Sequence, residues 1–200
     1  MARINAADRT IAATLIVAGP RQAGKTALLR TLTRRVPPAR LRAGTGQDAA
    51  LDPLLDWVSL HLGRIGGWDV AVDLYAVSGS PRFEHTRRLL LAEADGLLMV
   101  ADAQAVRLDD NLATLRGLRE ELLDREGAPR DVPMVFCWSK ADLPEELRVA
   151  PAALTAALNA RGAPAFEASL LRGDGILEAL HALVTLVLRR LGPGRVAGGV

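Results

Sequence analysis

The 200-residue chain is poor in cysteine, in aromatic residues and in long apolar runs, and each shortage excludes a class of protein. Cys137 is the one cysteine, so a disulfide within the chain is impossible, and its apolar neighbours predict a buried core thiol. Aromatic side chains make up 4% of the residues, so the core must be aliphatic, which suits parallel strands covered by helices. No apolar stretch reaches the roughly 20 residues of a membrane-spanning helix.

The charge and histidine patterns also exclude classes of function. The net charge is +2, and the arginines are interspersed with acids, so no basic stripe supports nucleic-acid binding. His61, His85 and His181 show no metal-ligand spacing with Cys137, so no zinc site is expected. The sequence has no signal-peptide pattern, no prenylation box, and Ala2 in place of a myristoylated glycine. We therefore expect a cytoplasmic protein with no direct membrane anchor.

One short stretch, GPRQAGKT at residues 19–26, carries the strongest chemical signal. It matches the P-loop spacing G-x-x-x-x-G-K-[ST] and lies between an apolar run and a helical segment, as that motif requires. Its glycines let the backbone N–H groups turn inward toward an anion, and Lys25 adds a charge for the phosphates. The Thr26 hydroxyl is the candidate ligand for Mg²⁺. The expected phosphate contacts are Gly19, Arg21, Gln22, Ala23, Gly24, Lys25, Thr26 and Ala27.

Apolar runs and helical periodicities predict alternating strands and helices along the chain. The strands are expected at 14–18, within 54–62, and at 68–77, 96–101, 132–138 and 165–168. The helices are expected at 27–35, 82–93, 108–126, 145–160 with an interruption at Pro151, and 175–191. Such alternation predicts an α/β fold, with a mostly parallel six-stranded sheet, one antiparallel edge strand and helices on both faces.

The remaining segments are expected to be irregular. Residues 1–11 read as a short lead-in, 37–53 as a long functional loop, and 192–200 as a flexible tail after a single domain at 1–191.

Ligands of such sheets bind at the carboxyl ends of the strands, so the residues that follow each strand are further site candidates. Gly79 follows the third strand and could offer its N–H to a γ-phosphate. After the fifth strand come Lys140, whose stem could cover a base, and Asp142, whose carboxylate could accept the N1–H and 2-amino hydrogens of guanine. After the sixth strand, the Ser169 hydroxyl could orient Asp142, and the Leu170 N–H could face the guanine oxygen.

At this level of detail the chain resembles the Ras-superfamily small GTPases, specifically their bacterial gliding-motility branch, the MglA-like proteins. The resemblance covers residues 12–191, nearly the whole chain. The residues that carry it are GP at 19–20 with GKT at 24–26, LHLGRIGG at 60–67, LYAVSG at 74–79, DG at 95–96 with VADAQ at 100–104, KADLP at 140–144 and GAPAFEA at 162–168.

The resemblance implies a P-loop NTPase G domain that binds GTP or GDP with Mg²⁺. It implies regulation of polarity or motility through a roadblock-type (MglB-like) or other regulatory protein partner. It also brings Ser139 into the base-binding set, at a position where the family has asparagine.

The chain departs from the family at residues that bear on catalysis. Arg21 replaces a second P-loop glycine, Ser139 replaces the asparagine, and Ser80 replaces the glutamine that positions the attacking water. The family's internal arginine finger, next to a threonine, aligns with Leu51 and Asp52, although Thr45 could supply the threonine in a shifted register. Loss of an arginine finger alone can remove roughly 10³–10⁵ in rate.

These departures leave several hypotheses. The leading one is a switch that binds guanine nucleotide and hydrolyses GTP weakly or not at all. A second is a competent GTPase that uses Arg21, Thr45, Ser80 or a partner's residue. A third is a pseudo-GTPase scaffold that is independent of nucleotide, and a distant fourth is a P-loop enzyme that uses ATP.

Overall fold

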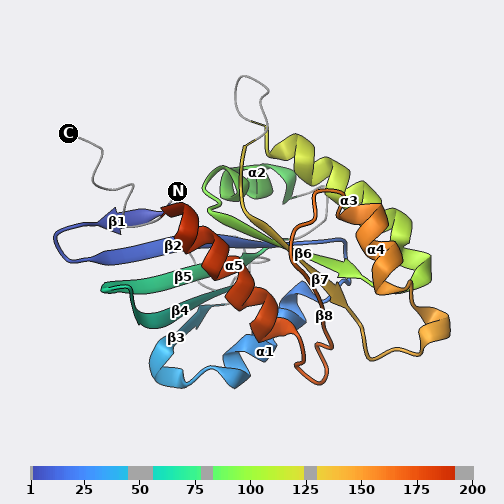
Figure 1. Cartoon of the computed structure of the whole chain (residues 1–200), viewed down its shortest axis with the longest axis horizontal. Helices are drawn as coiled ribbons and strands as arrows, with labels where there is room; N and C mark the ends of the chain where they lie inside the picture. The colour runs from blue at the N-terminus through green and yellow to red at the C-terminus, as the bar shows by residue number, and fades with distance from the viewer. Residues whose placement is uncertain (1, 45–55, 78–82, 124–129, 192–200) are drawn as a thin grey trace.

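The computed structural model describes residues 2–44, 56–77, 83–123 and 130–191, and shows a sheet with helices on both faces (Figure 1). In this part of the chain eight strands form one sheet. The strands are β1 (Arg3–Asn5), β2 (Thr10–Ala18), β3 (Leu41–Gly44), β4 (Asp56–Ile65), β5 (Trp68–Ala76), β6 (Gly96–Asp102), β7 (Met134–Ser139) and β8 (Ala165–Glu167). The α-helices are α1 (Lys25–Arg35), α2 (Glu84–Ala92), α3 (Leu108–Glu121), α4 (Pro151–Leu158) and α5 (Ile176–Leu191). Short 3₁₀ turns are η1 (Pro38–Arg40), η3 (Ala105–Arg107) and η4 (Glu145–Leu147).

The strand order across the sheet is β3-β4-β5-β2-β6-β7-β8, and β1 pairs with β2 at its amino end. Strands β5, β2, β6, β7 and β8 run parallel to their neighbours in this order. Strands β3, β4 and β5 pair antiparallel, as do β1 and β2. The α/β fold with a mostly parallel sheet and an antiparallel edge is therefore confirmed.

The central strand β2 explains why helices lie on both faces. Leu15 and Val17 belong to a core cluster shared with α1 and α5, whereas Ile16 and Ala18 belong to a second cluster shared with α2, α3 and α4. Successive side chains of a strand point to opposite faces, so an unbroken apolar run must be covered on both sides. Figure 1 shows α5 crossing one face of the sheet, with α3 and α4 side by side on the other.

The sheet has two strands more than the sequence predicted. β1 lies in the segment expected to be a lead-in, where Arg3–Asn5 pairs with Thr10–Ala12, and the Asn5 side chain accepts the Ala7 N–H at 3.0 Å in the intervening turn. β3 lies in the segment expected to be one loop, and follows the turn η1. Each strand has three or four residues, too few for alternation of apolar and polar residues to show.

Proline sets the start of α4, as the interrupted helix at 145–160 suggested. The segment splits into the turn η4 and a helix that begins at Pro151, because proline fits the first helical position but cannot continue a preceding helix. None of the described helices combines the length and the apolar composition that a membrane crossing would need.

Candidate functional site

The carboxyl ends of the parallel strands bring the predicted site segments to one edge of the sheet. β2 leads into the loop before α1, β6 ends at Asp102, β7 ends at Ser139 and β8 is followed by Ala168 and Ser169. Backbone hydrogen bonds tie the last two segments together: the Ala141 N–H donates to the Ala168 carbonyl at 3.1 Å. The site is therefore assembled from loops far apart in the sequence.

The loop between β2 and α1 depends on two glycines at points of close approach. A Cβ on Gly19 would lie 2.1 Å from the carbonyl oxygen of Val100, in the neighbouring strand β6. A Cβ on Gly24, which has a φ of 102°, would lie 2.1 Å from Cδ1 of Leu170. A larger side chain at Gly19 would push the loop off the sheet, because it meets backbone, and one at Gly24 would be strained by the positive φ and would displace the tip of the Leu170 side chain.

The amino end of α1 is open to an anion. Gly24 caps the helix without a side chain to accept the first N–H groups, and the first turn contains no acidic residue. Unpaired N–H groups and the positive end of the helix dipole favour negative charge at this place. Thr26 is half-buried in the same turn.

Lys25 is buried at 9% exposure, and its ammonium group is held by carbonyl oxygens. Nζ donates to the Gly19 carbonyl at 2.8 Å and to the Pro20 carbonyl at 2.7 Å, and it forms no ion pair with any described residue. Burial, followed by the positive charge of Arg87, lowers the pKa of Lys25 to about 8. A buried ammonium with no counter-ion is costly, and an anion would relieve that cost.

The segment after β7 presents Lys140 and Asp142. Lys140 has a φ of 62°, and its Nζ donates to Asp102 Oδ2 at 2.5 Å and to Gln104 Oε1 at 2.7 Å. Asp142 is half-buried, and no side-chain hydrogen bond to its carboxylate occurs among the described residues. Ser139 is fully buried and its hydroxyl donates to the Ala101 carbonyl at 3.1 Å.

The segment after β8 forms a tight turn against the first loop. The Ser169 hydroxyl accepts the Arg172 N–H at 3.2 Å, and the Gly173 N–H donates to the Ser169 carbonyl at 2.6 Å. The Leu170 carbonyl accepts the Thr31 hydroxyl at 3.2 Å, from α1. With its side chain against Gly24, Leu170 joins the loop before α1 to the last segment of the site.

Sequence reasoning gave no role to Asp102, which the structure places at the centre of the site. It is fully buried, and besides Lys140 its carboxylate accepts the Gln104 N–H at 3.1 Å. Asn111 of α3 clamps its backbone, because its amide group accepts the Asp102 N–H at 2.9 Å and donates to the Asp102 carbonyl at 2.8 Å. The available signal was an acid that ends an otherwise apolar strand.

Arg107 extends this network to the first loop. Its Nη2 donates to the Arg21 carbonyl at 2.7 Å, and its Nε lies 3.8 Å from Asp102 Oδ2. Oδ2 of Asp102 therefore lies near two cations: Lys140, from the segment after β7, and Arg107, which is bonded to the loop before α1 and also pairs with Asp110 at 2.6 Å.

The side chains of the other predicted site residues differ in their exposure to solvent. Within the loop Ala23 is buried, while the side chains of Arg21, Gln22 and Ala27 are exposed. Gln22 has a φ of 63°. Three predicted residues lie outside the described ranges: Thr45, Gly79 and Ser80.

The side chains around the amino end of α1 suit a metal ion that is held mainly by the phosphates of a bound substrate. No cluster of three histidine, cysteine, aspartate or glutamate side chains occurs in the described ranges. Mg²⁺ keeps several waters and binds through few protein ligands together with substrate phosphates, so the hydroxyl of Thr26 beside an anion site is a fitting donor.

Comparison with known proteins gives one informative relative. The Mutual gliding-motility protein MglA of Myxococcus xanthus (strain DK1622) is 31% identical to this chain over 198 residues, which cover 97% of the chain and 100% of the relative. No protein-family model matches the chain.

The close approach at Gly19 generates a stability prediction. Gly19→Ala should lower the free energy of unfolding by about 2–3 kcal/mol, because the added Cβ meets the Val100 carbonyl and the backbone cannot yield without moving β6. For a chain of this size that corresponds to a fall in Tm of roughly 5–10 °C, measured by circular dichroism.

Gly117→Ala is the matched control, since a Cβ at this position in α3 meets nothing within 4 Å. It should leave Tm unchanged or raise it slightly, because alanine favours helix by about 1 kcal/mol over glycine. Equal Tm values for the two variants would contradict the packing described for the loop.

Proposed function

The chain belongs to the MglA-like small GTPases of the Ras superfamily, a family of nucleotide-binding switches, and from this premise we propose how its own residues serve that function. In this proposal, residues 1–191 form one G domain. The domain binds GDP or GTP with Mg²⁺ at the carboxyl edge of the sheet and hydrolyses GTP slowly.

The observation that carries the phosphate part of this proposal is the buried ammonium of Lys25. Its two carbonyl partners carry no net charge, and its lowered pKa reflects the cost of burial. A diphosphate at the amino end of α1 would supply the missing negative charge and accept the free N–H groups of the first turn. The backbone of residues 19–27 would line the phosphates, and Thr26 would ligate Mg²⁺ through its hydroxyl.

The segments after β7 and β8 are suited to binding a guanine base. The carboxylate of Asp142 has no hydrogen-bond donor among the described residues, so it is available to the N1–H and 2-amino hydrogens of guanine. Asp102 holds Lys140 by its ammonium group, which leaves the aliphatic stem of the lysine to cover the base. Leu170 would offer its N–H to the guanine oxygen, while Ser139 and Ser169 shape these segments from buried positions.

Slow hydrolysis follows from the chemistry of the residues at the catalytic positions. Phosphoryl transfer depends on a group that orients the water and on a cation that neutralises developing charge. The serine side chain of Ser80 is too short for the first task, and Gly79 would contact only the γ-phosphate. Arg21 and Thr45 are the chain's own candidates for substituted groups, and a partner protein is the other source.

The name of the relative links that protein to gliding motility. We extend this role to the present chain as a regulator of polarity or motility, acting through a roadblock-type or other protein partner that responds to the bound nucleotide.

The titration of Lys25 predicts how nucleotide affinity depends on pH. A bound polyanion raises the pKa of Lys25 above its value of about 8 in the free protein, so binding takes up a proton. The contribution of Lys25 to GDP affinity should therefore be constant below pH 7 and fall as the pH rises above about 8. Calorimetric titration from pH 6.5 to 9 measures this directly.

Lys25→Met is the control for this series. It should weaken GDP binding by about 10–100-fold at pH 7, since a hydrogen bond to a charged group contributes roughly 1.5–3 kcal/mol. Its remaining pH dependence reports the titration of the nucleotide alone. If the native chain and the variant have the same affinity and pH profile, Lys25 does not bind the phosphates.

Asp142→Asn tests the assignment of the base. An amide side chain can donate to the 2-oxo group of xanthine but cannot accept both guanine hydrogens, so the variant should lose about 10–1,000-fold in affinity for GDP and gain affinity for xanthosine diphosphate. Competition against a fluorescent nucleotide gives both constants. Unchanged preference for GDP would remove Asp142 from the base site.

Single-turnover hydrolysis tests the catalytic part. The native chain alone should hydrolyse GTP at about 10⁻⁴ s⁻¹ or slower, as expected for a small GTPase that lacks an arginine finger. Arg21→Ala should leave this rate unchanged. A rate near 10⁻² s⁻¹ that collapses in Arg21→Ala would instead assign a competent enzyme with its finger in the first loop.

A further inference from the structure

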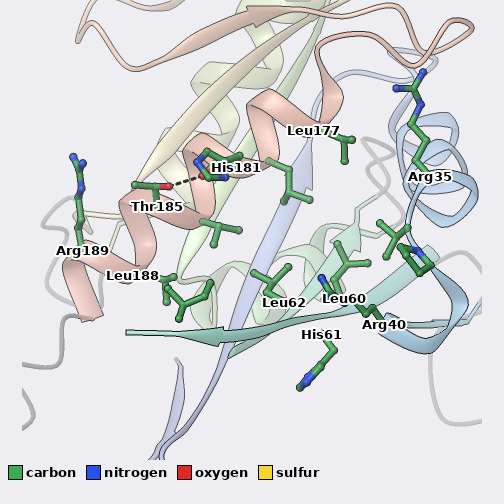
Figure 2. A pocket seen from close by; sticks show the side chains of 15 residues that line it. Arg35, Arg40, Leu60, His61, Leu62, Leu177, His181, Thr185, Leu188 and Arg189 are labelled. Atoms are coloured by element: carbon green, nitrogen blue, oxygen red, sulfur yellow. Dashed lines mark hydrogen bonds between the residues drawn. The ribbon is translucent and has the colours of Figure 1, made fainter. Parts of the chain in front are cut away.

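Hollows lie on both faces of the sheet. The larger one, about 880 Å³, lies between α5 and β4 (Figure 2), and none of its described lining residues is assigned to nucleotide binding. A smaller cavity of about 260 Å³ lies on the other face, between α2 and α3, and Gly19 of the phosphate loop lines it. We call it the α2–α3 cavity. It is the hollow that adjoins the proposed nucleotide site.

An ion pair between the two helices lies in the wall of the α2–α3 cavity. Arg87 of α2 donates from Nε to Oε2 of Glu121 of α3 at 2.7 Å, and from Nη2 to the other carboxylate oxygen. The two side chains are 19% and 8% exposed, so solvent screens them weakly. Among the described residues that line the cavity these two are the ionisable ones. The rest are small, apolar or hydroxyl-bearing: Ala18, Gly19, Val77, Ala113, Thr114, Gly117 and Leu118.

The guanidinium of Arg87 lies close enough to the phosphate loop to act on its lysine. The Lys25 ammonium donates to the carbonyl of Gly19, which lines the same cavity. After burial, the positive charge of Arg87 is the second cause of the lowered pKa of Lys25. The two cations repel each other, and an anion that reached both would turn this repulsion into attraction.

The strand order predicts which part of a nucleotide comes nearest to Arg87. In the proposed function the base lies at the segments after β7 and β8, and the phosphates lie at the loop after β2. The order β5-β2-β6-β7-β8 then directs the phosphate chain away from the base and toward β5. Val77, which follows β5, lines the α2–α3 cavity together with Arg87. The terminal phosphate of GTP, which GDP lacks, is therefore the part that approaches this cavity.

Helix α2 buries little of its own surface. Leu91 is the one buried residue among its nine, and the others are half-buried or exposed. The pair of Arg87 with Glu121 adds a polar tie to α3. A segment with so little apolar burial shifts at low cost in free energy. A small shift of α2 that brings Arg87 toward a terminal phosphate is therefore within the means of this fold.

Given the nucleotide site of the proposed function, on which this step rests, we propose that Arg87 binds the terminal phosphate of GTP and thereby distinguishes GTP from GDP. Glu121 is the positioning residue that orients its guanidinium. A guanidinium carries five N–H donors and a bidentate carboxylate takes two, so one arginine can serve a carboxylate and a phosphate together. A contact made equally in the ground state and the transition state raises affinity without raising kcat, which agrees with slow hydrolysis.

The test compares affinities for GDP and for the non-hydrolysable β,γ-imido analogue of GTP, by calorimetric titration of the full chain with Mg²⁺. Arg87→Met should weaken the triphosphate by about 10–100-fold and GDP by less than about threefold, since only the triphosphate has the group that Arg87 contacts. Arg88→Met is the matched control. This neighbouring arginine is 63% exposed and pairs with Glu84 of its own helix at 2.8 Å, so both affinities should stay as in the native chain.

Glu121→Gln separates a phosphate ligand from a residue that only fastens α2. The amide keeps one oxygen for the guanidinium but removes a negative charge near the terminal phosphate, so the triphosphate should gain about 3–10-fold in affinity relative to GDP. Both single variants break the ion pair. A fastener would therefore shift the ratio of the two affinities in the same direction in both, whereas a ligand shifts it in opposite directions.

The double variant Arg87→Met, Glu121→Gln guards against misfolding, because it leaves neither charge buried without its partner. It should bind the triphosphate about 10–100-fold more weakly than Glu121→Gln does. Circular dichroism of each variant confirms that it remains folded.

The outcomes distinguish the role of Arg87 from the proposed function. If both nucleotides bind and their affinity ratio is the same in the native chain, in Arg87→Met and in the double variant, Arg87 does not contact the phosphate, while the proposed function stands. A ratio that Arg87→Met and Glu121→Gln lower alike assigns the pair to holding α2 and also overturns the proposal. Binding of neither nucleotide to the native chain removes the proposed function, and the role of Arg87 falls with it.

Discussion

The ammonium group of Lys25 is buried against two carbonyl oxygens and forms no ion pair within the described part of the chain, and the organisation of the site depends on that condition. A charge so placed is tolerated where a ligand completes it. The amino end of α1 lacks a capping side chain and an acidic first turn, so no side chain of this turn competes with an anion for its N–H groups. The loop that builds this site in turn requires Gly19, because it passes within contact of β6, and favours Gly24, because the backbone there has a φ of 102°.

The second organising feature is the tie between loops that are distant in the sequence. Asp102 attracts Lys140 on the base side and Arg107, which holds the loop before α1 through the Arg21 carbonyl. Leu170 makes the same connection from the segment after β8. The loop before α1 and the segment after β7 are therefore parts of one network, whose carboxylate, that of Asp102, is fully buried. The Ser139 hydroxyl bonds to the Ala101 carbonyl, and other residues link the two loops.

Much of this arrangement could be predicted from the sequence, for physical reasons. Continuous apolar runs such as that of β6 must be buried on both faces, and the helical periodicity of α5 covers one of them. The P-loop spacing places Lys25 and Thr26 at a helix start. The short strands β1 and β3 could not be predicted, because they form through pairing with β2 and β4. Their own residues show no strand pattern. Asp102 was missed because its role arises from residues up to 38 positions away in the sequence.

In the proposed function the carboxyl edge of the sheet binds the nucleotide. The central claim, that the chain selects a guanine nucleotide, is tested most directly by calorimetric titration of the native protein with GDP and with ADP in the presence of Mg²⁺. The account predicts binding of GDP that is at least 100-fold tighter than that of ADP, as a site built to satisfy a buried polar group discriminates strongly. Equal affinities, or heat from neither nucleotide, would contradict it.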